Sequence, residues 1–252
     1  MTKQLTLISP ETYLSSTWSG GRTTQLCLLP AGASYAERNF DLRISSATVE
    51  MEESVFSDLR GYSRIIAPLE GSFDLQHPDR KGLQHFHLER YQLHAFDGGE
   101  KTLCRGRGRD FNVIFRHGLD VKVMRLDPGE EPLELDLSAA LAGAVLDKSG
   151  TTGADLTVSK AKKIYLFFPK ATSFEVEGEA GKAPALTLWQ FDPEQSREKS
   201  QENTYDENLL RQESCEKNGE ENGEEKMPRS LMLCSKLSAP AYLIMMLACK
   251  DE

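Results

Sequence analysis

The chain has 252 residues, 39% of them hydrophobic, so it can fold around a sizeable core and is not disordered throughout. Most of its net charge of −9 lies in one stretch, because eleven acidic residues against five basic ones between Glu194 and Lys226 contribute −6. The negative net charge would repel phosphate, and the sequence has no basic stripe of the kind that binds nucleic acid. These features argue against a nucleic-acid-binding protein.

The cysteines and the start of the chain indicate a cytoplasmic protein. Cys27, Cys104, Cys215, Cys234 and Cys249 are odd in number and form no C-x-x-C pair, which favours reduced thiols and argues against a four-cysteine zinc site. The first fourteen residues lack the apolar core of a secretory signal and instead contain a candidate strand.

Short β-rich runs, interrupted by Gly, Pro or Asp about every ten residues, extend along most of the chain. This rhythm predicts an all-β sandwich or barrel rather than alternating strands and helices. The predicted strands lie at 5–8, 23–29, 40–49, 64–68, 72–76, 84–88, 101–105, 110–116 and 121–126, and then at 133–137, 140–146, 156–159, 163–168, 173–176 and 184–190.

A similarity between two segments of the chain, which we call the sequence echo, suggests that the protein consists of two similar modules. The stretches "RIIAPLEGSFDLQ" at 64–76 and "KIYLFFPKATSFEVE" at 163–177 share a basic residue, an apolar strand, a turn and then Ser-Phe-acid-apolar. A spacing of about one hundred residues fits a duplicated β-module better than a solenoid. We therefore expect a first module at 1–125 and a second at 126–252.

Residues 193–228 are poor in apolar side chains and rich in Glu, Asn, Ser, Gln and Lys, which predicts a disordered acidic insertion. A solvated linker is the default interpretation, and recruitment of a basic partner is the alternative. The apolar stretch after it is broken by Lys236 and Pro240, and its clean run of nine residues is too short for a membrane helix. Two final strands are expected there, and no membrane partner.

Two arginines are candidates for binding an anion. In "FDLRISSATV" at 40–49, alternation places Arg43 and Ser45 opposite an apolar face, and Arg64 opens a later strand. Such side chains can simply face water, or they can line a pocket in which a guanidinium grips a carboxylate through two parallel hydrogen bonds. The same alternation in 110–116 places Asp110 and Asn112 on one face, where they either end a strand, line the pocket or, for Asp110, act as a base.

The stretch "HFHLERYQLH" at 85–94 is a candidate metal site, because His85, His87 and Glu89 alternate onto one strand face. A divalent metal would need a further ligand from elsewhere, and the sequence offers none with a distinctive signal. An exposed polar face is the default. A metal-dependent enzyme using these three residues, or a metal-free isomerase or lyase using Asp110, remains the alternative to a binding protein.

Four stretches taken in order, "TWSGGRTTQL", "NFDLRISSATV", "FSDLRGYSRIIAPLEG" and "HAFDGGEKTLCRGRGRDFNVIFRHG", resemble the HutD/Ves family. The resemblance covers residues 5–118 well and the second half only by its strand rhythm. It implies a bicupin, with two β-barrels in one chain, no metal or other cofactor, and no established enzymatic activity. It also implies binding of a small acidic metabolite such as formylglutamate, in connection with histidine utilisation or a stress response.

The resemblance implies a set of ligand-binding residues, in which Trp18 would form a wall and Gly20 would let the backbone turn past it. These residues are Trp18, Gly20, Thr23, Arg43, Ser45, Ser57, Arg64, Asp110 and Asn112. The sequence departs from the family at Ser19 and Arg22 and in the acidic insertion. It leaves the oligomeric state open, a homodimer included.

Overall fold

A computed structural model describes residues 5–82, 84–128, 133–136, 161–176, 179–191, 230–234 and 240–247. Within these ranges the only helical segment is the short 3-10 turn η1 (Pro10–Thr12), and every other regular element is a strand, which confirms the all-β prediction. The acidic insertion predicted at 193–228 and the strands predicted at 140–146 and 156–159 lie outside the described residues.

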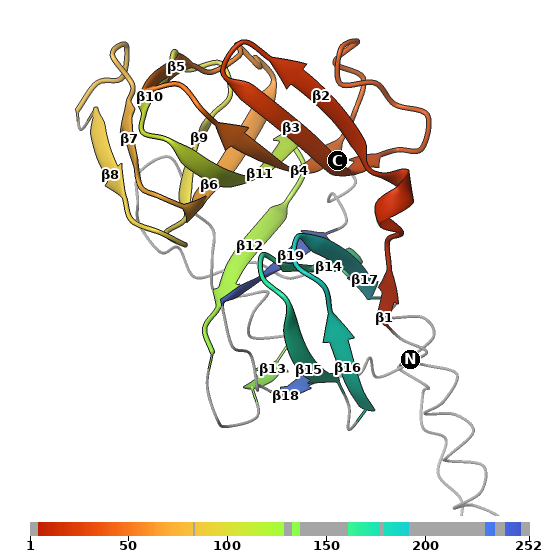
Figure 1. Ribbon diagram of the computed structural model, residues 1–252. Helices are drawn as coiled ribbons and strands as arrows, with labels where there is room; N and C mark the ends of the chain where they lie inside the picture. Colours follow the sequence, from red (N-terminus) through yellow and green to blue (C-terminus); the bar gives the residue numbers. More distant parts are fainter. Residues whose placement is uncertain are drawn as a thin grey trace, which may run out of the picture.

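The first barrel consists of two antiparallel sheets (Figure 1). An apolar cluster with residues from both sheets lies between them. In order across the larger sheet, the strands are β2 (Leu14–Trp18), β3 (Gly21–Leu29), β4 (Leu42–Val49), β11 (Gly108–Arg116), β6 (Tyr62–Glu70) and β9 (His94–Asp97). The smaller sheet contains β5 (Glu53–Val55), β10 (Leu103–Arg105), β7 (Phe73–Gln76) and β8 (His85–Leu88).

The second barrel has the same construction. Its larger sheet contains β1 (Leu5–Leu7), β17 (Thr187–Phe191), β14 (Ala161–Phe168), β19 (Ala241–Leu247) and β12 (Val121–Leu126). Its smaller sheet contains β13 (Leu133–Asp136), β18 (Ser230–Cys234), β15 (Thr172–Val176) and β16 (Glu179–Ala183). Strands β1 and β12 therefore pair within the second barrel (Figure 1), although β1 and all but the last residue of β12 precede the module boundary predicted at 125/126.

The strand pairing shows that the two barrels repeat one topology. The order β4-β11-β6-β9 in the first barrel corresponds to β12-β19-β14-β17 in the second, and β5-β10-β7-β8 corresponds to β13-β18-β15-β16. Strands β6 and β7, which carry the first copy of the sequence echo, correspond to β14 and β15, which carry the second. The chain after the acidic insertion returns as β18 and β19, as predicted, and no helix in the described residues is long and apolar enough to cross a bilayer.

The two larger sheets pack face to face through an apolar interface. Leu42 and Ile44 of β4 lie in this interface, while the alternate residues Arg43 and Ser45 lie on the inner face of the first barrel. Strand β4 is consequently buried on both faces. The Phe111 ring stacks on Phe167 and Tyr242 of the second barrel, with centroids 4.7 Å away in each case.

We expect Phe111→Leu to lower the free energy of unfolding by about 1–3 kcal/mol, because leucine keeps the apolar burial but loses two stacked ring pairs worth about 0.5–1.5 kcal/mol each. Urea unfolding measures the change. Val55→Ala, at an exposed position, is the control and should change little. An equal effect of both substitutions would contradict the interface described above.

Candidate functional site

Polar residues gather on the inner face of the larger sheet of the first barrel. Antiparallel pairing brings residues from neighbouring strands side by side on one face. One row across β3, β4, β11, β6 and β9 contains Gln25, Ser45, Asn112, Ile66 and His94, and the next contains Leu28, Arg43, Ile114, Arg64 and Phe96. A further row contains Thr23, Ala47, Asp110 and Pro68.

Arg43 is held in place from two sides. It is 7% exposed, its Nε donates a hydrogen bond to Gln25 Oε1 at 3.0 Å, and its Cζ lies 4.1 Å from the centroid of the Tyr35 ring. Neither terminal nitrogen donates to a described residue, and no described carboxylate forms an ion pair with it. Desolvation by burial lowers the pKa of Arg43. The fixed guanidinium therefore keeps two donor groups for another molecule.

Arg64 is buried among aromatic rings. It is 6% exposed, and its Cζ lies 4.5 Å from the Phe56 ring centroid and 5.2 Å from that of Phe96. Its Nε has no hydrogen-bond partner, and in the described part of the chain it forms no salt bridge. Burial lowers its pKa to about 10, so the guanidinium is still charged at neutral pH.

Among the described carboxylates, Asp110 is the one that interacts electrostatically with both arginines. It is 4% exposed, and its Oδ1 accepts a hydrogen bond of 2.7 Å from the backbone N–H of Ala47. Burial raises its pKa to about 6, while Ala47, Arg64 and Arg43 act in the opposite direction. No ion pair within 4 Å joins Asp110 to either arginine. The inner face therefore carries two positive charges against one negative charge.

Ser45 and Asn112 lie side by side between the two arginines and Asp110, on adjacent strands. Both are buried, and Asn112 Oδ1 accepts no hydrogen bond. A buried amide oxygen without a donor costs free energy unless a ligand or water supplies one. These two residues and the three charged ones are the members of the predicted site that the structure brings together.

The stretch that contains Trp18 and Gly20 forms the turn from β2 to β3. The Trp18 ring packs against the apolar cluster of the first barrel and lies directly over Gly20, where a Cβ atom would overlap it. Gly21 has a φ of +150°, and a Cβ there would collide with the backbone oxygen of Thr48. The glycines thus allow close approach, and Thr23, half-buried, lies in the row of Asp110.

Ser57, another predicted ligand-binding residue, is exposed in the loop after β5. Within the described part of the chain, it makes no polar contact with the buried residues of the inner face. Gln25 and Tyr35, which sequence reasoning did not identify, contact Arg43 directly. Alternation in β3 could have indicated Gln25, but a register shift between Gln25 and Cys27 interrupts that pattern.

The histidines considered for a metal site lie on the exposed side of β8. His87 is 52% exposed, with Nδ1 2.7 Å from Asp74 Oδ1 and Nε2 3.2 Å from Glu89 Oε1. These carboxylates raise the pKa of His87. His85 is also exposed. In the described ranges, no three His, Cys, Asp or Glu side chains are grouped so that they could hold a metal ion.

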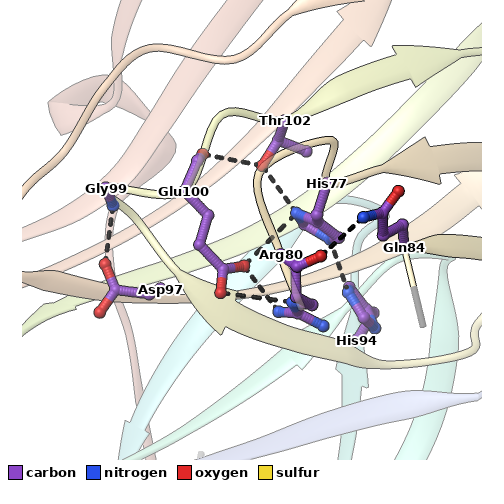
Figure 2. Close-up of polar contacts among 8 residues, drawn as sticks. All are labelled: His77, Arg80, Gln84, His94, Asp97, Gly99, Glu100 and Thr102. Atoms are coloured by element: carbon purple, nitrogen blue, oxygen red, sulfur yellow. Dashed lines mark hydrogen bonds and ion pairs between the residues drawn. The ribbon is translucent and has the colours of Figure 1, made fainter. Parts of the chain in front are cut away.

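A second polar cluster, not anticipated from the sequence, joins two loops of the first barrel (Figure 2). Buried His77 lies 3.1 Å from His94, measured between the two Nε2 atoms, and its Nδ1 lies 3.1 Å from Thr102 Oγ1. Arg80 forms a two-pronged ion pair with Glu100. Burial lowers the pKa of both histidines to about 4, so both rings are neutral at pH 7.

The described inner face of the second barrel is mostly apolar. A buried cation lies on it nevertheless: Lys122 of β12, the strand that corresponds to β4, is 1% exposed and pairs with the inward Met245. At the positions of β14 and β19 that correspond to β6 and β11, the inward side chains are apolar, and they pack with Phe174 of the smaller sheet. These residues are Ile164, Leu166, Phe168, Ala241, Leu243 and Met245. The described positions of β14 and β19 therefore hold no charged counterpart of Arg64 or Asp110, so the combination of two arginines and a carboxylate belongs to the first barrel.

Two cupin-type barrels in one chain, the first with a cationic interior, define this protein as a bicupin. The sequence profile of the HutD family matches residues 10–182, and the chain belongs to that family. A search of curated proteins found no match.

Three solved structures share the fold. PA5104 from Pseudomonas aeruginosa PAO1, a conserved protein of unknown function, is 18% identical with a TM-score of 0.62, over 98% of this chain and 100% of that one. HutD from Pseudomonas fluorescens SBW25 is 19% identical with a TM-score of 0.59, over 96% and 98%. The bacterial pirin YhhW from Escherichia coli, solved with nickel(II), is 8% identical with a TM-score of 0.54, over 96% and 99%.

Proposed function

We propose that the protein binds a small carboxylate metabolite on the inner face of its first barrel and acts as a binding protein without a metal. The proposal rests on one observation: Arg43 and Arg64 are both buried, yet neither forms an ion pair with a described residue. Burying unpaired charge is costly, so a site that keeps two such groups beside a single carboxylate is complementary to an added anion.

The hydrogen-bonding groups indicate how such an anion would be held. Gln25 fixes Nε of Arg43 and leaves its terminal nitrogens to donate in parallel to a carboxylate. The unpartnered Nε of Arg64 offers a further donor, and Asn112 Oδ1 offers an acceptor for an N–H group. A ligand with carboxylates and an amide N–H satisfies all three.

N-formylglutamate has this combination of groups, and it is the ligand we propose to test first. Binding of this metabolite would connect the protein to amino-acid catabolism, with histidine degradation as the proposed pathway. The protein would then regulate that pathway by sensing or sequestering the intermediate.

Arg43→Met should abolish the rise in melting temperature that N-formylglutamate produces, while the ligand-free protein stays folded. The reason is that methionine keeps the length and apolar contacts of the side chain but removes the charge and the donors. Differential scanning fluorimetry with and without the ligand measures this. Arg60→Met, at a residue 85% exposed, is the matched control and should keep the full shift. An unchanged shift in Arg43→Met would remove Arg43 from the site.

A metal-free enzyme is the second candidate, and the raised pKa of Asp110 favours it, since a value of about 6 suits a general base near neutral pH. Proton NMR of N-formylglutamate after incubation with the protein distinguishes the two candidates. Quantitative recovery of the ligand supports a binding protein. Conversion that is lost in Asp110→Asn supports an enzyme.

A further inference from the structure

Asp110 interacts electrostatically with the two arginines that would hold the proposed ligand. The charged and titratable groups that act on it are Arg43 of β4, Arg64 of β6 and Arg109 of β11, with Cys104 of β10 nearby in the interior. Arg109 is turned partly outward, where its Nε lies 3.8 Å from Glu70. The inward charge balance is therefore set by Arg43, Arg64 and Asp110.

Only one oxygen of Asp110 is fixed by the backbone. Oδ1 accepts the 2.7 Å hydrogen bond from Ala47, and no described residue donates a hydrogen bond to Oδ2. The side chain can therefore take a proton on Oδ2 without losing its bond to β4. A protonated carboxyl group becomes a donor as well as an acceptor.

The charge balance makes the state of Asp110 depend on the ligand. With Asp110 ionised, the two arginines leave the inner face with one net positive charge. A bound monoanion neutralises that charge, whereas a dicarboxylate leaves an excess negative charge in a buried site. Two carboxylates that compete for the same cations in a low-dielectric interior disfavour joint ionisation. Protonation of Asp110 removes that conflict and restores neutrality with two arginines and a dianion.

We propose that anion binding in the first barrel is proton-linked through Asp110: a dicarboxylate binds together with one proton from solvent, which Asp110 Oδ2 takes up. Asp110 thereby determines the charge class of the ligand. Dianions are favoured when it is protonated, and monoanions when it is ionised. This inference rests on the proposed function, because it requires an anion between Arg43 and Arg64.

Calorimetry with N-formylglutamate at pH 7, in two buffers of different ionisation enthalpy, counts the protons exchanged on binding. The wild type should take up about one proton per ligand, and its affinity should fall by up to about tenfold per pH unit as the pH rises above neutrality. Asp110→Asn, whose amide oxygen can still accept from Ala47, should bind with no proton uptake and a flat pH profile. His94→Gln should keep the proton uptake, because the histidine pair is not the proton acceptor.

Infrared spectroscopy gives a readout that needs no variant. A band of a protonated carboxylic acid should appear when the wild type binds the ligand. Binding without proton uptake and without this band would overturn the proton linkage but leave the proposed function intact. Uptake that is lost in His94→Gln and kept in Asp110→Asn would also overturn it. No heat of binding in any buffer, with no ligand-induced rise in melting temperature, would instead refute the proposed function.

Discussion

Arg64→Met should make the ligand-free protein more stable, by about 1–4 kcal/mol, and should also abolish its stabilisation by N-formylglutamate. Arg64 is buried with an unpartnered Nε, and its charge has no ion pair in the described residues. Methionine fills a similar volume, and its sulfur can contact the rings of Phe56 and Phe96 that now flank the guanidinium. The gain in stability with loss of binding is the pattern expected of a residue retained for function.

Urea unfolding and ligand-induced thermal shifts measure both parts of this prediction. Arg90→Met is the control, because Arg90 also lies over an aromatic ring, that of Tyr91 at 4.8 Å, but is exposed. Its Nε is partnered, however, with a hydrogen bond of 2.7 Å to the Leu69 carbonyl oxygen. Arg90→Met should therefore lower the stability slightly and keep ligand binding. A loss of stability in Arg64→Met would contradict the view that its charge is uncompensated.

The histidine pair should make the protein sensitive to acid. Folding lowers the pKa of His77 and His94 to about 4, so between pH 6.5 and 4 the unfolded chain binds protons that the folded chain does not. The contribution of the neutral histidines to the free energy of unfolding is therefore fully present above pH 6.5, and it is lost as the pH decreases toward 4. The loss is about 3 kcal/mol for buried His77, and less for His94, which is partly exposed.

Asp110 acts in the opposite direction, because its raised pKa lowers stability as the pH rises from about 4 to 6. The histidine contribution is therefore obtained as the free energy of unfolding of the wild type minus that of the double variant His77→Gln, His94→Gln. That difference should shrink by about 3 kcal/mol or more between pH 7 and 4.5 in urea unfolding. His85→Gln, at an exposed position, should keep the wild-type profile. If the difference in the free energy of unfolding between the wild type and the double variant did not change with pH, the acid sensitivity could not come from His77 and His94.

Alternation along single strands was sufficient to predict the faces of the key residues. It separated Arg43 and Ser45 from the apolar face of β4, and Asp110 and Asn112 from Phe111. It could not show whether the polar face is buried, because that depends on the opposite sheet of the same barrel. The sequence echo between 64–76 and 163–177 did predict the duplication, since both copies fall on corresponding strands.

Contacts between segments that are distant in the chain could not be predicted from the sequence. Tyr35 reaches Arg43 from a loop, and Gln25 does so from a strand whose register shifts at the next residue. His77 and His94 are seventeen positions apart with no recognisable spacing. Their contact joins the residue after β7 of the smaller sheet to the first residue of β9 in the larger sheet, so it depends on how the two sheets meet. Strand β1 joins the second barrel through β17, a pairing that no local pattern near the start of the chain indicates.

A crystal structure of the wild type with N-formylglutamate tests the central claim most directly. We predict a ligand carboxylate on the inner face of the first barrel, within hydrogen-bonding distance of the Arg43 terminal nitrogens and of Arg64 Nε. A ligand bound elsewhere, with both guanidinium groups still lacking an anion at saturating concentration, would contradict the account.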